Sequence, residues 1–161
     1  MHTTLLPREN NVTRLYLDLC VYNRPFDDQR QPRIVIETME FIFLLSKTIQ
    51  GEIDLVNSFV LEFENINNPY VDRKDIVHDI LGIASTSIAY DAELGRRAKE
   101  IEQLGVNALD ALHIACAEKA KSDFFITCDD RLARKCSAVE NALKVKARPL
   151  MKFVAEEVFK T

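Results

Sequence analysis

The sequence has no tryptophan and few of the residues that interrupt regular structure. Its 161 residues include only four glycines and five prolines, whereas apolar residues make up 47% and charged residues 29%. This composition excludes collagenous, repeat and intrinsically disordered chains. A chain of this length can bury a core without help from disulfides or a structural metal. We therefore expect one globular domain of ordinary size.

Long hydrophobic runs and paired cysteines are also missing. The apolar run 41–45 ends at Ser46, and no segment reaches the roughly 20 residues that span a membrane. The first residues contain no apolar signal region. The four cysteines form no C-x-x-C pair and have no histidine at zinc-ligand spacing, which argues against a zinc ribbon or a redox motif. We expect a cytoplasmic protein with reduced thiols and no membrane association.

Positive charge is slightly outnumbered by negative charge. The net charge of −4 means that the chain as a whole does not attract nucleic acid. A nucleic-acid substrate would therefore need a local basic patch or bridging metal ions. The candidates for holding phosphates are Arg24, Arg131, Arg134 and Lys135, although solvated surface charge is the ordinary role of such residues.

Strand-like apolar runs alternate with helical patterns from residue 14 onward. Strands are expected at 14–18, 54–58, 84–88, 124–127 and 143–147, and helices at 32–48, 58–64, 72–81, 91–104, 108–121, 130–136 and 149–159. Parallel neighbours require crossover helices, so the alternation predicts an α/β fold: a doubly wound α/β/α sandwich around a central, mainly parallel five-stranded sheet. Residues 1–13 show no period, and we expect a flexible N-terminal extension before a single domain at 14–161.

Acidic residues lie close to the ends of these strands. Asp18, Glu62 and Asp129 follow apolar runs, and Asp110 opens a helix that Asn107 can cap. All four positions belong to the carboxyl edge of a parallel sheet. A carboxylate beside a buried strand is costly unless a cation or donor balances it, so four of them together predict a metal site. Oxygen ligands with few histidines favour Mg²⁺ or Mn²⁺ over zinc.

Each acid also has a purely structural interpretation. Asp110 could simply stabilise its helix start, but its apolar surroundings favour a functional role. Asp18 could end its strand as a turn residue. Helical phase favours Glu62 over Glu64, which projects about 200° away around the axis. Asp130 is the expected cap of the short helix 130–136, which leaves Asp129 for the metal site.

Two further residues could support phosphodiester hydrolysis, the reaction class that such a metal site predicts. His113 could act as an acid or orient a ligand, whereas a histidine on a buried helix is more often a hydrogen-bonded core residue. The Thr127 hydroxyl could hold a metal-bound water, or the residue could reflect strand propensity alone.

The order of these motifs resembles the PIN-domain nucleases. The matching segments are Leu-Tyr-Leu-Asp18, Ser58-Phe-Val-Leu-Glu62, Asp110-Ala-Leu-His-Ile-Ala and Ile-Thr127-Cys-Asp129-Asp130, within residues 14–153. The resemblance implies a doubly wound fold and a metal-dependent endoribonuclease that cleaves single-stranded RNA. It also implies that Asp18, Glu62, Asp110 and Asp129 match the family's acidic quartet, and that Thr127 matches the hydroxyl beside the last aspartate.

Many small stand-alone PIN proteins, the VapC-like ones, are toxins of toxin-antitoxin pairs. The resemblance therefore implies an antitoxin partner that covers the acidic groove, and a homodimer. The chain departs from the compact toxins in its loop 23–28 and in the long helix that follows.

Other phosphate-transfer folds fit the sequence less well. A haloacid-dehalogenase-type phosphatase needs an aspartate two residues after its nucleophile, where this chain has Cys20. A receiver-type phosphoacceptor needs its acidic pair near the first strand, whereas Asp129 and Asp130 come late. The remaining alternative is a PIN-like module that binds RNA or protein without cutting, which a misplaced Glu62 would favour.

Overall fold

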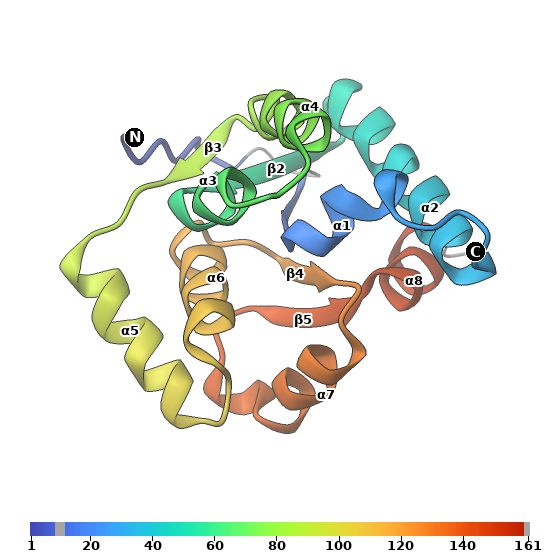
Figure 1. The fold of residues 1–161 in the computed structure, drawn as a ribbon. Coiled ribbons are helices and arrows are strands. Elements are labelled where there is room, and N and C mark those ends of the chain that lie inside the picture. The colour runs from blue at the N-terminus through green and yellow to red at the C-terminus, as the bar shows by residue number, and fades with distance from the viewer. Residues whose placement is uncertain (9–11, 160–161) are drawn as a thin grey trace.

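A single five-stranded sheet lies between helical layers in the computed structural model, which describes residues 1–8 and 12–159 (Figure 1). The strands are β1 Thr13–Leu17, β2 Ile53–Ser58, β3 Thr86–Ile88, β4 Phe124–Thr127 and β5 Lys146–Pro149. Their order is β3-β2-β1-β4-β5, and all neighbouring pairs are parallel. The predicted doubly wound α/β fold is confirmed. The last strand starts later than expected, at Lys146 rather than Leu143.

The crossovers between the strands are helical. The helices are α1 Leu19–Asn23, α2 Pro32–Ile49, α3 Phe59–Ile66, α4 Val71–Leu81, α5 Ala92–Gln103, α6 Ala108–Lys119, α7 Asp130–Ala138 and α8 Leu150–Phe153, with short 3-10 turns Arg24–Phe26 and Glu140–Ala142 and a π turn Val154–Val158. Two predicted caps are confirmed. The Ser58 hydroxyl accepts a hydrogen bond from Leu61 N at 3.1 Å, and the Asn107 side chain accepts one from Asp110 N at 2.9 Å. None of the helices in the described part of the chain is long and apolar enough to cross a membrane.

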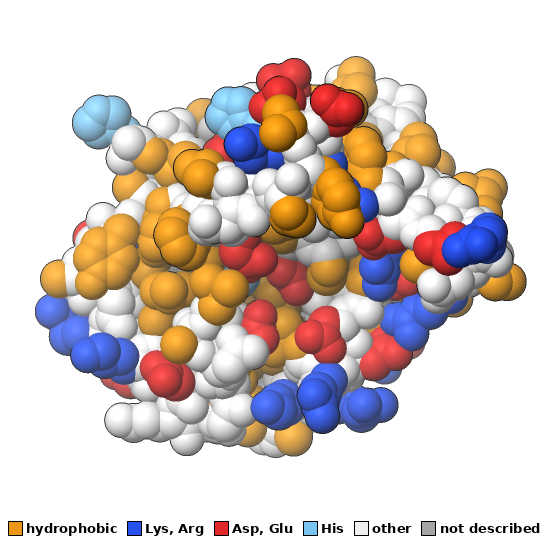
Figure 2. All heavy atoms as spheres, viewed as in Figure 1, with side chains coloured by type: hydrophobic (Ala, Val, Ile, Leu, Met, Phe, Trp, Pro, Cys, Tyr) orange, Lys and Arg blue, Asp and Glu red, His pale blue; other side chains and the backbone are white. Residues whose placement is uncertain are grey.

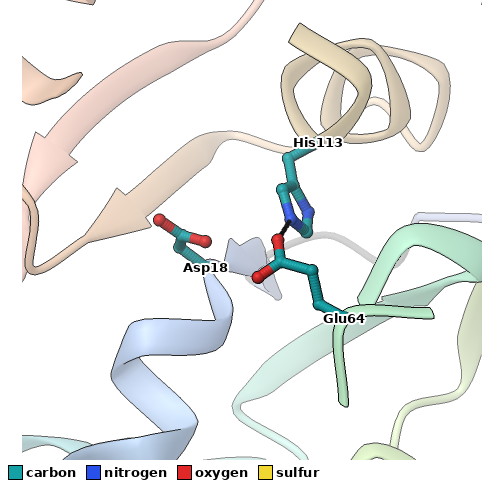
Figure 3. A group of neighbouring side chains, drawn as sticks. All are labelled: Asp18, Glu64 and His113. Atoms are coloured by element: carbon teal, nitrogen blue, oxygen red, sulfur yellow. Dashed lines mark hydrogen bonds and ion pairs between the residues drawn. The ribbon is translucent and has the colours of Figure 1, made fainter. Parts of the chain in front are cut away.

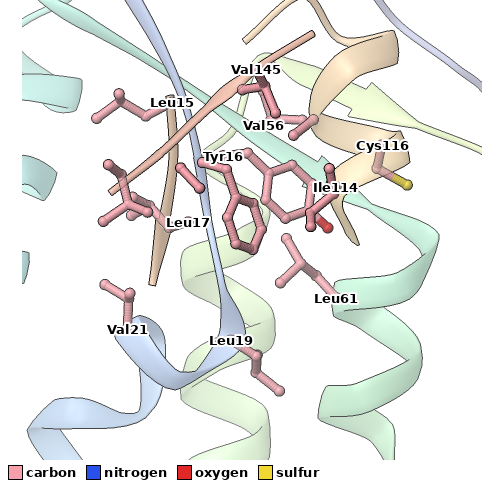
Figure 4. Packing of buried hydrophobic residues seen from close by; sticks show 14 of the residues in the cluster. Leu15, Tyr16, Leu17, Leu19, Val21, Val56, Leu61, Ile114, Cys116 and Val145 are labelled. Carbon is pink, nitrogen blue, oxygen red and sulfur yellow. The ribbon is translucent and has the colours of Figure 1, made fainter. Parts of the chain in front are cut away.

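The core lies against the middle of the sheet and under α6. Leu15, Tyr16 and Leu17 of β1 are completely buried, and half of the residues of α6 are buried. Figure 4 shows Tyr16, Leu61 and Ile114 packed together from three elements. Because β1 is buried on both faces, its apolar run is continuous rather than alternating. The rigid centre of the fold therefore ends directly at Asp18.

The N-terminal segment runs beside the edge strand β3. Thr4 and Ser87 exchange backbone hydrogen bonds of 2.8 and 2.9 Å in an antiparallel bridge. The bridge pairs part of a sheet edge that would otherwise be exposed. The predicted flexible extension, 1–13, includes residues 9–11, which lie outside the described residues. Its flexibility and the domain start at residue 14 therefore remain predictions.

Candidate active site

Asp18 lies at the carboxyl end of β1, with 7% of its surface exposed. Its Oδ1 accepts a hydrogen bond from Leu19 N at 2.8 Å and so caps α1. Its Oδ2 accepts the Thr127 hydroxyl at 2.8 Å. Because β4, which carries Thr127, is the neighbour of β1, two adjacent strand ends fix this carboxylate at the sheet edge.

The Cys20 thiol is a third neighbour of this carboxylate. Its Sγ lies 3.4 Å from Asp18 Oδ2 and accepts a hydrogen bond from Cys128 N at 3.3 Å. The pKa of the Cys20 thiol is raised well above its usual value, mainly by the contact with Cys128 and then by burial. The thiol therefore stays protonated and donates toward Asp18 instead of acting as a thiolate ligand.

The Thr127 hydroxyl connects Asp18 with Asp129. It donates to Asp18 Oδ2 and accepts a hydrogen bond from Asp129 N at 3.0 Å. Its proton is therefore committed to Asp18, so in this arrangement the hydroxyl orients the two acids. The sequence also allowed it to hold a metal-bound water, and that role remains a prediction.

Asp129, and not Asp130, caps α7. Its Oδ1 accepts hydrogen bonds from Arg131 N at 3.0 Å and Leu132 N at 3.2 Å. The predicted cap was wrong because a cap has extended backbone, and Asp129 has φ −87° and ψ 101°, whereas Asp130 is already helical. Asp130 instead binds the Arg33 guanidinium at 2.6 and 2.9 Å, which lowers the pKa of the Asp130 carboxyl. The second oxygen of Asp129 makes no hydrogen bond with the described residues.

Asp110 is half-buried at the third position of α6. The Asn107 side chain accepts a hydrogen bond from Asp110 N and also donates one to Asp110 Oδ2 at 2.6 Å. The pKa of Asp110 is raised mainly by burial and then by the negative charge of Asp18, and the charge of Asp129 adds to this effect. His113 and the Asn107 amide act in the opposite direction. Asp18 and Asp129 thus lie close enough to Asp110 to disfavour its negative charge.

The acid that α3 contributes differs from the prediction. Glu62 is turned toward α4, where one of its oxygens contacts His78 Nδ1 at 2.9 Å, and its other oxygen accepts a hydrogen bond from Asn57 Nδ2 of β2 at 3.0 Å. Glu64 instead faces Asp18 and His113, as Figure 3 shows. One ligand atom from each of Asp18, Glu64 and His113 lies within 4.8 Å of the others.

The phase argument was right that the two glutamates point to different sides of α3. It assigned the wrong side to the site, because α3 contacts α4 on one face and α6 on another. Which face meets the acids is decided by that packing and not by the helical period.

His113 is completely buried and uses both ring nitrogens. Its Nε2 contacts Glu64 Oε1, and its Nδ1 lies 2.6 Å from the Tyr16 hydroxyl, which in turn lies 2.6 Å from Ser58 Oγ. One proton arrangement satisfies all of these groups: Ser58 donates to Tyr16, Tyr16 to His113, and His113 to the Glu64 carboxylate. The network therefore orients Glu64.

Sequence reasoning missed Tyr16 and Ser58 as parts of this network. The available signal was a tyrosine inside the otherwise aliphatic run 15–17, since a buried hydroxyl needs a partner.

Replacing Tyr16 by phenylalanine tests this network. The change leaves His113 Nδ1 without its donor in a buried position, which should lower the free energy of unfolding by roughly 1–3 kcal/mol. Because Glu64 loses its fixed orientation, Mn²⁺ should bind roughly tenfold more weakly. Urea unfolding and calorimetric Mn²⁺ titration measure the two effects. Tyr22→Phe is the control, since Tyr22 is also buried, its ring packs against Phe41, and within the described residues no hydrogen bond joins it to His113. Equal Mn²⁺ affinity in both variants would contradict the network's role.

Arg24, a predicted supporting residue, is bound within the protein. Its guanidinium contacts Asp27 at 2.9 Å and the buried Glu37 at 3.2 Å. These contacts hold the loop 23–28 against α2. Because its single charge is shared between two carboxylates, Arg24 has less capacity for a phosphate than an unpaired arginine would have.

The donor set at this edge suits a hard divalent cation. Asp18, Glu64, Asp110 and Asp129 offer carboxylate oxygens, which Mg²⁺, Mn²⁺ and Ca²⁺ prefer. His113 contributes no free nitrogen, because both are hydrogen-bonded. Burial and then the charges of Asp18 and Asp129 raise the pKa of Asp110, and a bound cation would relieve the repulsion between these charges. The cluster therefore fits a metal site.

Comparisons with known proteins agree with this geometry. The family model for the PIN domain matches residues 32–137. No curated protein matches the chain. Among solved structures, a similar chain comes from the crystal structure of VapBC2 from Rickettsia felis bound to a DNA fragment from their promoter. It is 14% identical, with a TM-score of 0.52, and the match covers 85% of this chain and 98% of that one. At this identity the likeness shows the fold alone.

Proposed function

Because the chain belongs to the PIN domain family, whose members are typically metal-dependent nucleases, we propose that it is an endoribonuclease that hydrolyses phosphodiester bonds of single-stranded RNA with Mg²⁺ or Mn²⁺. The observation that supports this proposal is that Asp18 groups with Glu64 and that the charges of Asp18 and Asp129 act on Asp110, all at one sheet edge. Asp18 lies outside the matched segment 32–137, so its place in the cluster is evidence independent of the family match.

The side chains have distinct tasks in this chemistry. A bound Mg²⁺ or Mn²⁺ would neutralise charge on the reacting phosphate and lower the pKa of the attacking water. Asp18, held by Leu19 N and Thr127, and Asp129, held by the first turn of α7, provide fixed oxygens. Glu64 Oε2 makes no hydrogen bond with the described chain and can accept the proton of the water while the phosphorus–oxygen bond to the leaving strand breaks. The leaving oxygen then takes a proton from solvent.

A PIN-like domain that binds RNA or protein without cutting is the competing function. A misplaced Glu62 would favour it, and Glu62 does lie away from the acids. Glu64 supplies a carboxylate in its place, however, so the number of acids at the edge is unchanged. The presence of Glu64 at the place expected for Glu62 supports cleavage over binding alone.

We further propose that the protein acts as the toxin of a toxin-antitoxin pair, with an antitoxin partner and a homodimeric state. The structural similarity to the VapBC2 chain supports this role at the level of the fold.

A direct test uses a random-sequence single-stranded RNA pool, labelled at its 5′ end. Internal cleavage is expected with Mg²⁺ or Mn²⁺ and should stop when EDTA is added. Duplex RNA of the same composition is the control and should be cut more slowly. A pool that stays intact with both metals would refute the nuclease proposal.

A further inference from the structure

Helix α7 exposes a row of positive charge beside the acids. Arg131, Arg134 and Lys135 occupy positions i, i+3 and i+4 and are exposed, whereas Leu132 and Ala133 are buried on the opposite face. Figure 2 shows Lys and Arg side chains gathered over α7, next to the acidic side chains at the centre of the same face. Asp129 caps this helix, so the row begins one turn or less from the acidic edge.

These charges are not used to hold the protein together. Within residues 1–8 and 12–159, Arg131, Arg134 and Lys135 form no ion pair, and their side chains form no hydrogen bond. Apart from Arg96, the remaining arginines all contact a carboxylate: Arg8, Arg14, Arg24, Arg30, Arg33, Arg73, Arg97 and Arg148. Among the described arginines, two of the three without such a contact, Arg131 and Arg134, lie on α7. Lysines without an ion pair also lie elsewhere in the described chain, so α7 is distinguished by its place beside the acids.

Helix stability can explain Lys135, which lies in the last turn, and Arg134, whose charge acts on Asp130, but it does not explain Arg131. Arg131 is the second residue of α7, and the positive end of the helix dipole disfavours a cation in the first turn. On the opposite side of the acidic cluster, Figure 2 shows apolar side chains over α3 and α6, and the Lys and Arg side chains over α5 lie farther from the acids than those over α7. Phe63 and Tyr90 are 59% and 61% exposed. A polyanion that reaches the acids can therefore find compensating charge on the α7 side.

We propose that the exposed face of α7 binds successive backbone phosphates of single-stranded RNA and so guides the strand across Asp129. This inference rests on the proposed nuclease function and specifies how its substrate is held. Without the row, the carboxylates would repel the strand, because the chain also carries a net charge of −4. The apolar opposite side suits unpaired bases, which single strands present and duplexes conceal.

Binding measured without metal separates this proposal from catalysis. We would titrate a labelled single-stranded RNA in EDTA, where no cleavage is expected, and follow anisotropy at several salt concentrations. The test variant carries Arg131→Gln, Arg134→Gln and Lys135→Gln. The control carries Arg96→Gln, Lys99→Gln and Lys144→Gln, which removes the same charge elsewhere on the surface.

Three lost phosphate contacts should reduce the slope of log K against log salt by about 2, since each contributes about 0.7 on single strands. If the variant and the wild type bind RNA equally at about 1 M salt, this change in slope corresponds to about 50-fold weaker binding of the variant at about 0.15 M salt. The control should bind nearly as the wild type does.

Equal losses in the two variants, no measurable wild-type binding at low salt, or tighter binding of duplex RNA would each overturn the proposal. The result is independent of the nuclease test. A protein that binds through α7 but leaves RNA intact would refute the nuclease proposal alone.

Discussion

Replacing Asp110 by asparagine is expected to abolish cleavage and, at the same time, to stabilise the metal-free protein. Changing the carboxylate to an amide removes one negatively charged ligand oxygen from the cluster, which should reduce cleavage more than about a hundredfold. It also removes a negative charge that burial and Asp18 disfavour. Because the side chain is only half-buried, we expect a gain of no more than about 1 kcal/mol. RNA cleavage assays and urea unfolding in EDTA measure the two effects.

The pH dependence provides a second measure of the same group. The folded-state pKa of Asp110 is raised, so between its unfolded and folded pKa the folded protein binds more protons than the unfolded one. This contribution to stability is present at low pH and is lost as the pH rises through the folded pKa. The Asp110→Asn variant should lack that loss, so its stability relative to the wild type should increase with pH.

Asp28→Asn is the control for this pair of measurements. Asp28 is exposed, and hydrogen bonds from Arg30 lower the pKa of the Asp28 carboxyl, opposite in direction to Asp110. The variant should cleave RNA at the wild-type rate. An Asp110→Asn protein that still cuts RNA normally, or one that is less stable than wild type in EDTA, would contradict the placement of Asp110 in a repulsive metal-binding cluster.

The two glutamates of α3 should respond in opposite ways to the same substitution. Glu64→Gln changes the carboxylate that faces Asp18 and His113, and cleavage should fall by more than about a hundredfold. Glu62→Gln changes a side chain turned toward Asn57 and His78, and cleavage should stay within about threefold of wild type. The two variants lie on one helix and differ by the same atoms, so each is the control for the other.

His78 gives this comparison an independent readout. The Glu62 carboxylate raises the pKa of His78, so Glu62→Gln should shift the His78 titration, observed by NMR, to lower pH. Glu64→Gln should leave that titration in place. A larger cleavage defect in Glu62→Gln than in Glu64→Gln would restore the original sequence prediction and reject the orientation of α3 described above.

Much of the fold could be predicted from local sequence alone. The apolar run 15–17, the helical spacing in α2 and the caps Ser58 and Asn107 are local signals, because they depend on neighbouring residues and backbone hydrogen bonds. Alternating strands and helices then restrict the topology, since parallel strands need crossovers of one hand. The same rule also predicts which edge of the sheet carries the acids.

Single-residue choices at the site could not be predicted in this way. Asp129 and Asp130 are adjacent and chemically identical, and the backbone angles at the end of β4 decide which of them caps α7. Tyr16 and Ser58 become a network only because α6 brings His113 to them across long sequence separations.

The sequence by itself therefore determined the PIN-like fold and the placement of Asp18, Asp110 and Asp129 at one edge, because strand ends and helix starts are set by short-range patterns. Only the tertiary structure decided that Glu64, rather than Glu62, joins them. Both glutamates are compatible with an amphipathic helix, and the rotation of α3 is fixed by its simultaneous packing against α4 and α6. Helical periodicity determines the angle between two side chains, whereas packing determines which of them faces the site.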